Sequence, residues 1–244
     1  MDIREQLTIC FARRLLQTPE GRAHVLNQVA DAESNGENQV FEHVLRHVKD
    51  PSLRKMIEKH QADEVRHEQL FRACLPRTGV DPGPVPAHLK LIDRLDRAVG
   101  GFFSQPIVDD QGVMEAYVML QVIEERAIVQ FAIFERAFRA HDPATADVFA
   151  EVARDEERHL KYCHAISRRY APSEEVLQEK LTNYRALEAR CFQDNAAANL
   201  QHTIANGILA GGPAVKWFWK TIQSLGHNQL PYTPYATANT LAAA

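Results

Sequence analysis

Cysteine is scarce in this sequence, and no two cysteines are spaced to bind zinc or to form a redox-active pair. The four cysteines are Cys10, Cys74, Cys163 and Cys191, and none belongs to a Cys-x-x-Cys motif. In a chain of 244 residues, this pattern favours reduced thiols over a disulfide framework. The sequence therefore predicts a cytoplasmic protein.

Long apolar runs and an excess of positive charge are also absent, and each absence excludes a class of partner. No stretch reaches the roughly 18 apolar residues typical of a membrane-spanning helix. The first residues, MDIREQLTIC, include an acid at position two and lack the apolar core of a signal peptide. The net charge of -4 argues against a nucleic-acid-binding protein, which usually has a basic face. We therefore expect no membrane and no nucleic acid among the partners.

The alternation of apolar and polar residues typical of strands is nearly absent, whereas helical periodicity runs along most of the chain. Asp50-Pro51 and Asp142-Pro143 each supply an N-cap and a first-turn proline, and Ser173 precedes two acids, so each predicts a helix start. The predicted helices span residues 4–17, 19–47, 51–75, 87–98, 107–141, 143–170 and 173–195, with a further apolar segment at 199–224.

The centre of this pattern is two long helices, a connection of about thirty residues and two more long helices. A helical pair cannot bury its apolar faces alone, and two such pairs suit an antiparallel four-helix bundle with one long crossover. The sequence thus predicts an all-α fold, with extra helices before and after the bundle.

The most informative feature present is an internal repeat at an offset of 92 residues. Residues 63–67, DEVRH, match residues 155–159, DEERH, so the pattern D-E-x-R-H occurs twice. Glu33 matches Glu125, and each lies 31 residues before the glutamate of its motif. The repeat therefore supplies four carboxylates and two imidazoles in two matching sets, which are the ligands of a dinuclear metal site.

Helical spacing places these ligand-type residues together. Glu64 and His67 are three residues apart and share a helix face, as do Glu156 and His159. Their neighbours at helical spacing are apolar, so the acids fall where the core should be. Because a buried unpaired carboxylate is very costly, two metal cations are the expected compensation. Carboxylate-rich ligation with one imidazole per ion suits iron or manganese.

With these motifs, residues 19–170 resemble the ferritin-like superfamily of dinuclear carboxylate proteins. The doubled D-E-x-R-H is similar to the signature of di-iron oxygenases and of rubrerythrin-type proteins. The resemblance implies a single ferritin-like domain over residues 1–244, with a helical extension and tail at 171–244. It also implies six metal ligands, which are Glu33, Glu64, His67, Glu125, Glu156 and His159.

The resemblance also implies roles for the other charged residues of each motif. Asp63 and Asp155 would each accept a hydrogen bond from the ligating histidine of the opposite half, and Arg66 and Arg158 would pair with these aspartates. A metal-bound imidazole needs such an acceptor for its other N–H group.

By the same resemblance, the expected cofactor is a pair of iron ions, with manganese as the alternative. The implied function is that of an oxidoreductase that activates dioxygen to oxidise a small molecule, with an electron donor and no catalytic residue beyond the metal ligands. A ferroxidase or iron-storage protein and a peroxide-detoxifying protein are the alternatives. We expect a homo-oligomer, most simply a dimer.

Two further acids leave the choice of ligands open. Glu37 and Glu124 compete with Glu33 and Glu125, because each lies close to its rival in the sequence. The repeat favours Glu33 and Glu125, which match each other at the same offset as the motifs. Either rival could still lie beside the metals or bridge them.

Three features have no counterpart in the repeat. His60 lies one turn before Glu64 and could face the site, but its partner is Val152, so an ordinary partly buried histidine is the simpler interpretation. Gly36 lies within an expected helix, where it allows close packing or leaves space for dioxygen or a substrate. The aromatic residues 217–219 favour core packing or a subunit contact.

Overall fold

The computed structural model describes residues 3–34 and 37–227, and every regular element among them is helical. The all-α prediction is therefore confirmed for this part of the chain. The α-helices are α1 (Ile3–Leu15), α2 (Pro19–Ser34), α3 (Glu37–His47), α4 (Pro51–Cys74), α5 (Leu91–Ala98), α6 (Asp110–Phe138), α7 (Pro143–Tyr170), α8 (Glu174–Ala205) and α9 (Pro213–His227). Short 3-10 helices lie at Leu75–Thr78, Ala87–Leu89 and Phe102–Ser104. Within the described ranges, no helix is long and apolar enough to cross a membrane.

Side-chain caps fix two of the predicted helix starts. The carboxylate of Asp50 accepts hydrogen bonds from the backbone N–H groups of Ser52 and Leu53, at 2.8 and 3.1 Å, and a proline opens α4. Asp142 accepts one from the N–H of Thr145 at 3.1 Å, and a proline opens α7. These bonds satisfy donors that have no partner within the helix. Because α4 and α7 start in the same way, their motifs lie at matching distances from the helix starts.

Three predicted helices differ from the structure. The helix expected over 87–98 is a short 3-10 helix, Ala87–Leu89, followed by α5 from Leu91. The single helix expected over 19–47 is two helices, α2 and α3, and Gly36 lies between them, outside the described residues. The helix expected from 173 continues beyond its predicted end to Ala205, because the alanine-rich segment 196–198 favours helix. Gly207 follows with a φ of 70°, in the left-handed region where glycine commonly ends a helix.

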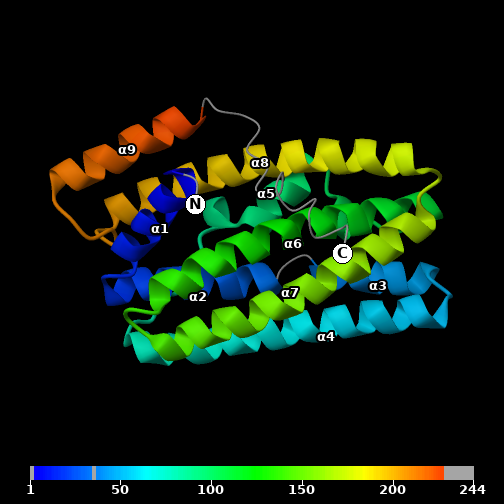
Figure 1. Cartoon of the computed structure of the whole chain (residues 1–244), viewed down its shortest axis with the longest axis horizontal. Helices are drawn as coiled ribbons and strands as arrows, with labels where there is room; N and C mark the ends of the chain where they lie inside the picture. Colours follow the sequence, from blue (N-terminus) through cyan, green and yellow to red (C-terminus); the bar gives the residue numbers. More distant parts are fainter. Residues whose placement is uncertain (1–2, 35–36, 228–244) are drawn as a thin grey trace.

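Helices α4 and α7 pack against each other, with α2 on α4 and α6 along α7 (Figure 1). Two apolar clusters fill the interior between these helices. One contains Phe71 of α4 and Phe149 of α7, and the other contains Ile57 of α4 and Cys163 of α7. On both helices the D-E-x-R-H motif lies between the two clusters. Apolar side chains therefore close the motif region at either end.

Helix α6 is buried on a second face because α8 runs along it. Met114, Val118 and Val122 of α6 form a cluster with Leu177 and Leu181 of α8. Figure 1 shows α8 and α4 along opposite edges of the molecule, with α6 between them. The two faces of α6 therefore have different neighbours, and a buried residue on α6 can belong to either side.

The aromatic residues near the end of the described chain are not all part of the core. Trp219 of α9 packs against the first apolar cluster, and its ring centroid lies 5.2 Å from that of Phe11 in α1. Trp217 is 69% exposed and Phe218 is 42% exposed. The expectation of core packing thus holds for Trp219 alone.

Candidate metal centre

The two D-E-x-R-H motifs face each other in the interior, one on α4 and one on α7. Their glutamates and histidines are at most 3% exposed, and acids of α2 and α6 are buried beside them. The resulting carboxylate cluster consists of Glu33, His60, Glu64, His67, Glu124, Glu156 and His159. Acidic and imidazole groups from four helices are therefore buried together in an arrangement that could hold metal.

Within the carboxylate cluster, the potential ligand atoms form two groups. In each group these atoms all lie within 4.8 Å of one another. The two-histidine group consists of His60, Glu64, Glu124 and His159, and the one-histidine group consists of Glu33, Glu64, His67 and Glu156. Glu64 belongs to both, so the two groups are adjacent.

In the two-histidine group, three helices direct nitrogen and oxygen atoms towards one oxygen of Glu64. Nε2 of His60 lies 2.8 Å from Oε1 of Glu124 and 3.2 Å from Oε1 of Glu64. Nδ1 of His159 lies 3.0 Å from the same oxygen of Glu64. His60 and His159 therefore contribute one nitrogen each to this group.

In the one-histidine group, three carboxylates surround a single imidazole nitrogen. Nδ1 of His67 lies 3.3 Å from Oε2 of Glu33, 3.2 Å from Oε1 of Glu156 and 3.7 Å from Oε2 of Glu64. The other oxygen of Glu156, Oε2, lies 2.6 Å from Nδ1 of His159. Glu64 and Glu156 thus each direct one oxygen to each motif histidine.

Several buried atoms of the carboxylate cluster have no hydrogen-bond partner among the described residues. They include Oε2 of Glu33, Oε1 of Glu64 and Nδ1 of His67. Oppositely charged groups lie 3.0 to 3.7 Å from them, but these contacts are ion pairs without hydrogen bonds. Buried polar atoms without partners are rare because each one costs free energy. A donor set of four carboxylates and three imidazoles suits iron or manganese, so the residues present fit two such ions.

Burial shifts the pKa values of the clustered groups in the metal-free protein. Burial and the charges of Glu124 and Glu64 raise the pKa of Glu156 to about 7. Burial raises the pKa of Glu33 well above its usual range, although contact with His67 opposes this. Burial lowers the pKa of His67, but contacts with Glu156 and Glu33 outweigh it, and the net shift is upward. The cluster therefore holds protons at neutral pH unless cations replace them.

The outer nitrogen of each motif histidine faces the aspartate of the opposite motif. Nε2 of His67 lies 3.3 Å from Oδ2 of Asp155, and Nε2 of His159 lies 3.4 Å from Oδ2 of Asp63. An aspartate at Nε2 holds the proton there and leaves Nδ1 free to bind a metal. This crossed pairing matches the one that the resemblance implied for Asp63 and Asp155.

Basic side chains hold the two aspartates in place. Arg66 of α4 contacts Asp155, and Nη2 of Arg158 donates to Oδ2 of Asp63 at 2.8 Å. Arg158 also lies 2.6 Å from Asp155, and Nζ of Lys59 lies 2.5 Å from Oδ1 of Asp63. Burial raises the pKa of Asp63, but its hydrogen-bond donors outweigh this and lower it well below the usual range. Asp63 is therefore an ionised acceptor.

The structure does not bring Glu125 into the carboxylate cluster, although the repeat had favoured it over Glu124. Nε and Nη2 of Arg185, from α8, donate to Oε2 and Oε1 of Glu125 at 2.8 and 2.5 Å. Nε2 of Gln121 donates to Oε1 of Glu125 at 3.0 Å. Glu125 thus has a cationic partner of its own, whereas Glu124 lies against the histidines.

The position of each acid on α6 explains this difference. Glu124 continues a stripe that includes Tyr117, in the apolar cluster shared with α4 and α7. Glu125 continues the stripe of Val118 and Val122, which packs against α8. Side chains of adjacent residues in a helix point about 100° apart. Glu124 therefore faces the motifs of α4 and α7, whereas Glu125, one residue later, faces α8. The sequence could not show that α8 covers the second stripe.

His60 is the other residue of the carboxylate cluster that the repeat had set aside. Its partner in the repeat, Val152, lies in the apolar cluster around Phe149. A signal for His60 was nevertheless present, because it precedes Glu64 by four residues and His67 by seven. This spacing places all three on one face of α4.

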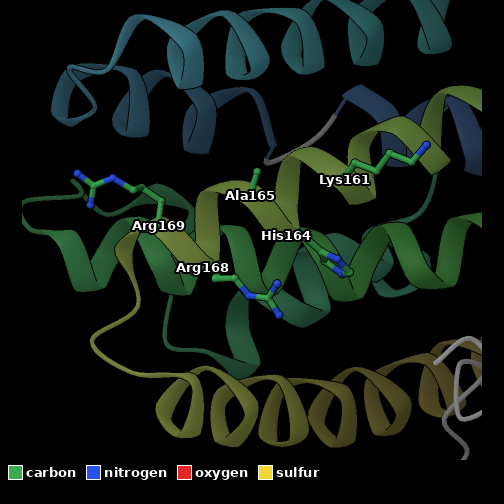
Figure 2. Close-up of a pocket in the computed structure, with 5 residues that line it drawn as sticks. All are labelled: Lys161, His164, Ala165, Arg168 and Arg169. Carbon is green, nitrogen blue, oxygen red and sulfur yellow. The ribbon is translucent and has the colours of Figure 1, made fainter. Parts of the chain in front are cut away.

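The remaining rival ligand, Glu37, begins α3, and its side chain lies outside what the structure describes. A shallow hollow on the outer surface of α7 is separate from the carboxylate cluster (Figure 2). Its lining residues are Lys161, His164, Ala165, Arg168 and Arg169. All of them are exposed and none is acidic, so this hollow does not provide a second carboxylate site.

Comparisons of the chain with models of known protein families, with curated proteins and with solved structures found no match.

Proposed function

We propose that this chain is a ferritin-like dinuclear metal protein, with iron as its metal, that activates dioxygen to oxidise a small molecule. In this proposal α2 with α3, α4, α6 and α7 correspond to the four helices of the ferritin-like bundle. The two-histidine group and the one-histidine group would hold one ion each. Glu64 and Glu156 would contact both ions.

The observation that carries the proposal is the combination of two adjacent ligand groups with crossed aspartate–histidine pairs. Glu64 is shared between the groups, and atoms of Glu33, Glu64 and His67 are buried without hydrogen-bond partners. A duplicated salt-bridge pattern without metal would leave these buried atoms without hydrogen bonds, with only protons to balance the charge of the acids. Two cations would satisfy them, and oxygen-rich ligation with imidazole is typical of iron and manganese sites.

When bound, the iron pair supplies the electrons that reduce dioxygen. The side chains supply position and surroundings. Glu64 and Glu156 hold the two groups together, because each has one oxygen directed to either histidine. Asp63 and Asp155 keep the protons on Nε2 and turn Nδ1 of both motif histidines inward.

The apolar residues on either side of the motifs exclude water from the carboxylate cluster. Phe41 packs on His60, with ring centroids 4.7 Å apart, and Phe71 packs on Phe149 at 4.9 Å on the other side. Phe41 and Phe71 are fully buried. A site without bulk water strengthens electrostatic interactions and limits side reactions.

Metal content and oxygen consumption test the proposal. The full-length protein, reconstituted anaerobically with Fe(II), should bind about two ions per chain. Exposure to air should then oxidise the bound iron and consume dioxygen. A protein that retains fewer than about one ion per chain under these conditions contradicts the proposal.

The fate of added Fe(II) separates an oxidase from the iron-handling alternative. An oxidase reacts with dioxygen at the bound pair and stops until a reductant returns electrons. A ferroxidase instead oxidises excess Fe(II) continuously and accumulates a mineral core. Continuous turnover of many Fe(II) ions per chain would therefore favour iron storage over oxidation of a small molecule.

A further inference from the structure

We infer that the two metal positions are chemically unequal, because His60 makes one of them discriminate more strongly than the other in favour of Fe(II) and Co(II) over Mn(II). This inference rests on the proposed dinuclear site and adds the metal preference of each half. The repeat predicts two equivalent halves with one imidazole each. The structure instead gives one group two histidines and the other group one.

His60 has a well-defined place in the two-histidine group. Its side chain is fully buried, and its Nε2 lies 2.8 Å from Glu124 and 3.2 Å from Glu64. Its ring stacks on His159, with centroids 3.9 Å apart, and Phe41 covers another side at 4.7 Å. Because these neighbours confine the ring, Nε2 is already directed at the oxygens of the group. Metal binding should therefore cost little conformational entropy in the His60 side chain.

The two groups differ in imidazole content, whereas their carboxylates are similar. Each contains Glu64 and one further acid, Glu124 or Glu33, and Glu156 directs one oxygen to the motif histidine of either group. Imidazole suits iron, cobalt and zinc, and their affinity for such sites exceeds that of manganese. Carboxylate-rich sites suit manganese, so the one-histidine group should discriminate less between the metals.

The surroundings of the two outer aspartates reinforce the inequality. Asp63, which faces His159, is contacted by Lys59 in addition to Arg66 and Arg158. Asp155 faces His67 and is contacted by Arg66 and Arg158. In the repeat, Lys59 is matched by Glu151, an acid that pairs with Arg66. The aspartate that faces His159 therefore has one more cationic neighbour than the aspartate that faces His67.

Stepwise metal titration of the metal-free, full-length protein tests this inference. Under anaerobic conditions, calorimetry should resolve two Co(II) binding steps whose affinities differ by about tenfold or more. The two Mn(II) steps should lie closer together. Replacement of His60 by glutamine should weaken the tighter Co(II) step by about 100-fold, since loss of a direct ligand should cost at least as much as loss of an outer-sphere partner.

Two controls keep the result interpretable. His164→Gln changes an exposed histidine on α7 outside the cluster and should leave both steps unchanged. In His60→Gln, retention of the second step shows that the variant is folded. Two equal steps in the wild type, or two steps that are insensitive to His60→Gln, would overturn the inference and leave the dinuclear site intact. Failure of the wild type to bind either metal would instead remove the proposed function.

Discussion

Glu124 and Glu125 are neighbours on α6 with similar burial, yet they lie in opposite surroundings. Glu124 is 3% exposed and contacts the imidazole of His60, with other acids nearby. Glu125 is 6% exposed and accepts two hydrogen bonds from Arg185 of α8. Next to it, Arg126 forms a buried bidentate pair with Glu188, also of α8. We call these two contacts the α6–α8 ion pairs.

The comparison shows that burial of an acid does not by itself indicate a metal ligand. The α6–α8 ion pairs match each carboxylate with a guanidinium, so their charge is balanced within the protein. In the carboxylate cluster, four acids are instead paired with three imidazoles. Its balance depends on protons or on added cations. The partner of a buried acid, rather than its burial, therefore separates structural from metal-binding roles.

The strongest test of this contrast is Glu64→Ala. Because Glu64 belongs to both ligand groups, its loss should reduce iron from about two ions per chain to nearly none. Metal analysis after anaerobic reconstitution measures this directly. Glu125→Gln is the matched control and should keep the full metal content, since Glu125 lies outside the cluster. Equal losses of iron in both variants would remove the distinction between the two acids.

The next largest effect should follow from Glu188→Gln. This substitution should lower the stability of the protein and leave its iron content unchanged. The side chains of Arg126 and Glu188 are 5% and 3% exposed, so the change removes the negative charge from a buried ion pair. Breaking such a pair typically lowers the free energy of unfolding by about 3 kcal/mol or more. Urea unfolding of the metal-free protein measures the change, and the iron content should stay at the wild-type value. A variant with normal stability but reduced iron would contradict this assignment.

Much of the fold follows from local sequence signals. The Asp-Pro pairs at 50–51 and 142–143 set the starts of α4 and α7, because cap and proline effects act within a single turn. The motif spacing likewise placed Glu64 with His67 and Glu156 with His159. Each of these predictions depends only on residues within one helix, which is why the sequence was sufficient for them.

The choice between Glu124 and Glu125 could not be made in the same way. It depends on which stripe of α6 faces α7 and which faces α8, and both stripes are apolar. The prediction of Glu125 came from the repeat, on the assumption that its two halves are equivalent. The same assumption excluded His60 from the predicted ligands. The α6–α8 ion pairs have no counterpart in the first half of the repeat, so symmetry fails at the position where α8 packs.

Asp155 shares features with both the α6–α8 ion pairs and the carboxylate cluster. Its substitution should have the smallest effect of the three. It contacts Arg66 and Arg158, as an acid in an ion pair does, but it also lies 3.3 Å from Nε2 of His67. Asp155→Asn should therefore weaken metal binding by about 10- to 100-fold, as is typical for loss of an outer-sphere acceptor. Chelator competition measures this affinity. His67 belongs only to the one-histidine group. The substitution should therefore lower the affinity of the binding step at this group and leave the other step nearly unchanged. An unchanged affinity for both steps would show that Asp155 serves only to pair with the arginines, and would move it to the structural side of the comparison.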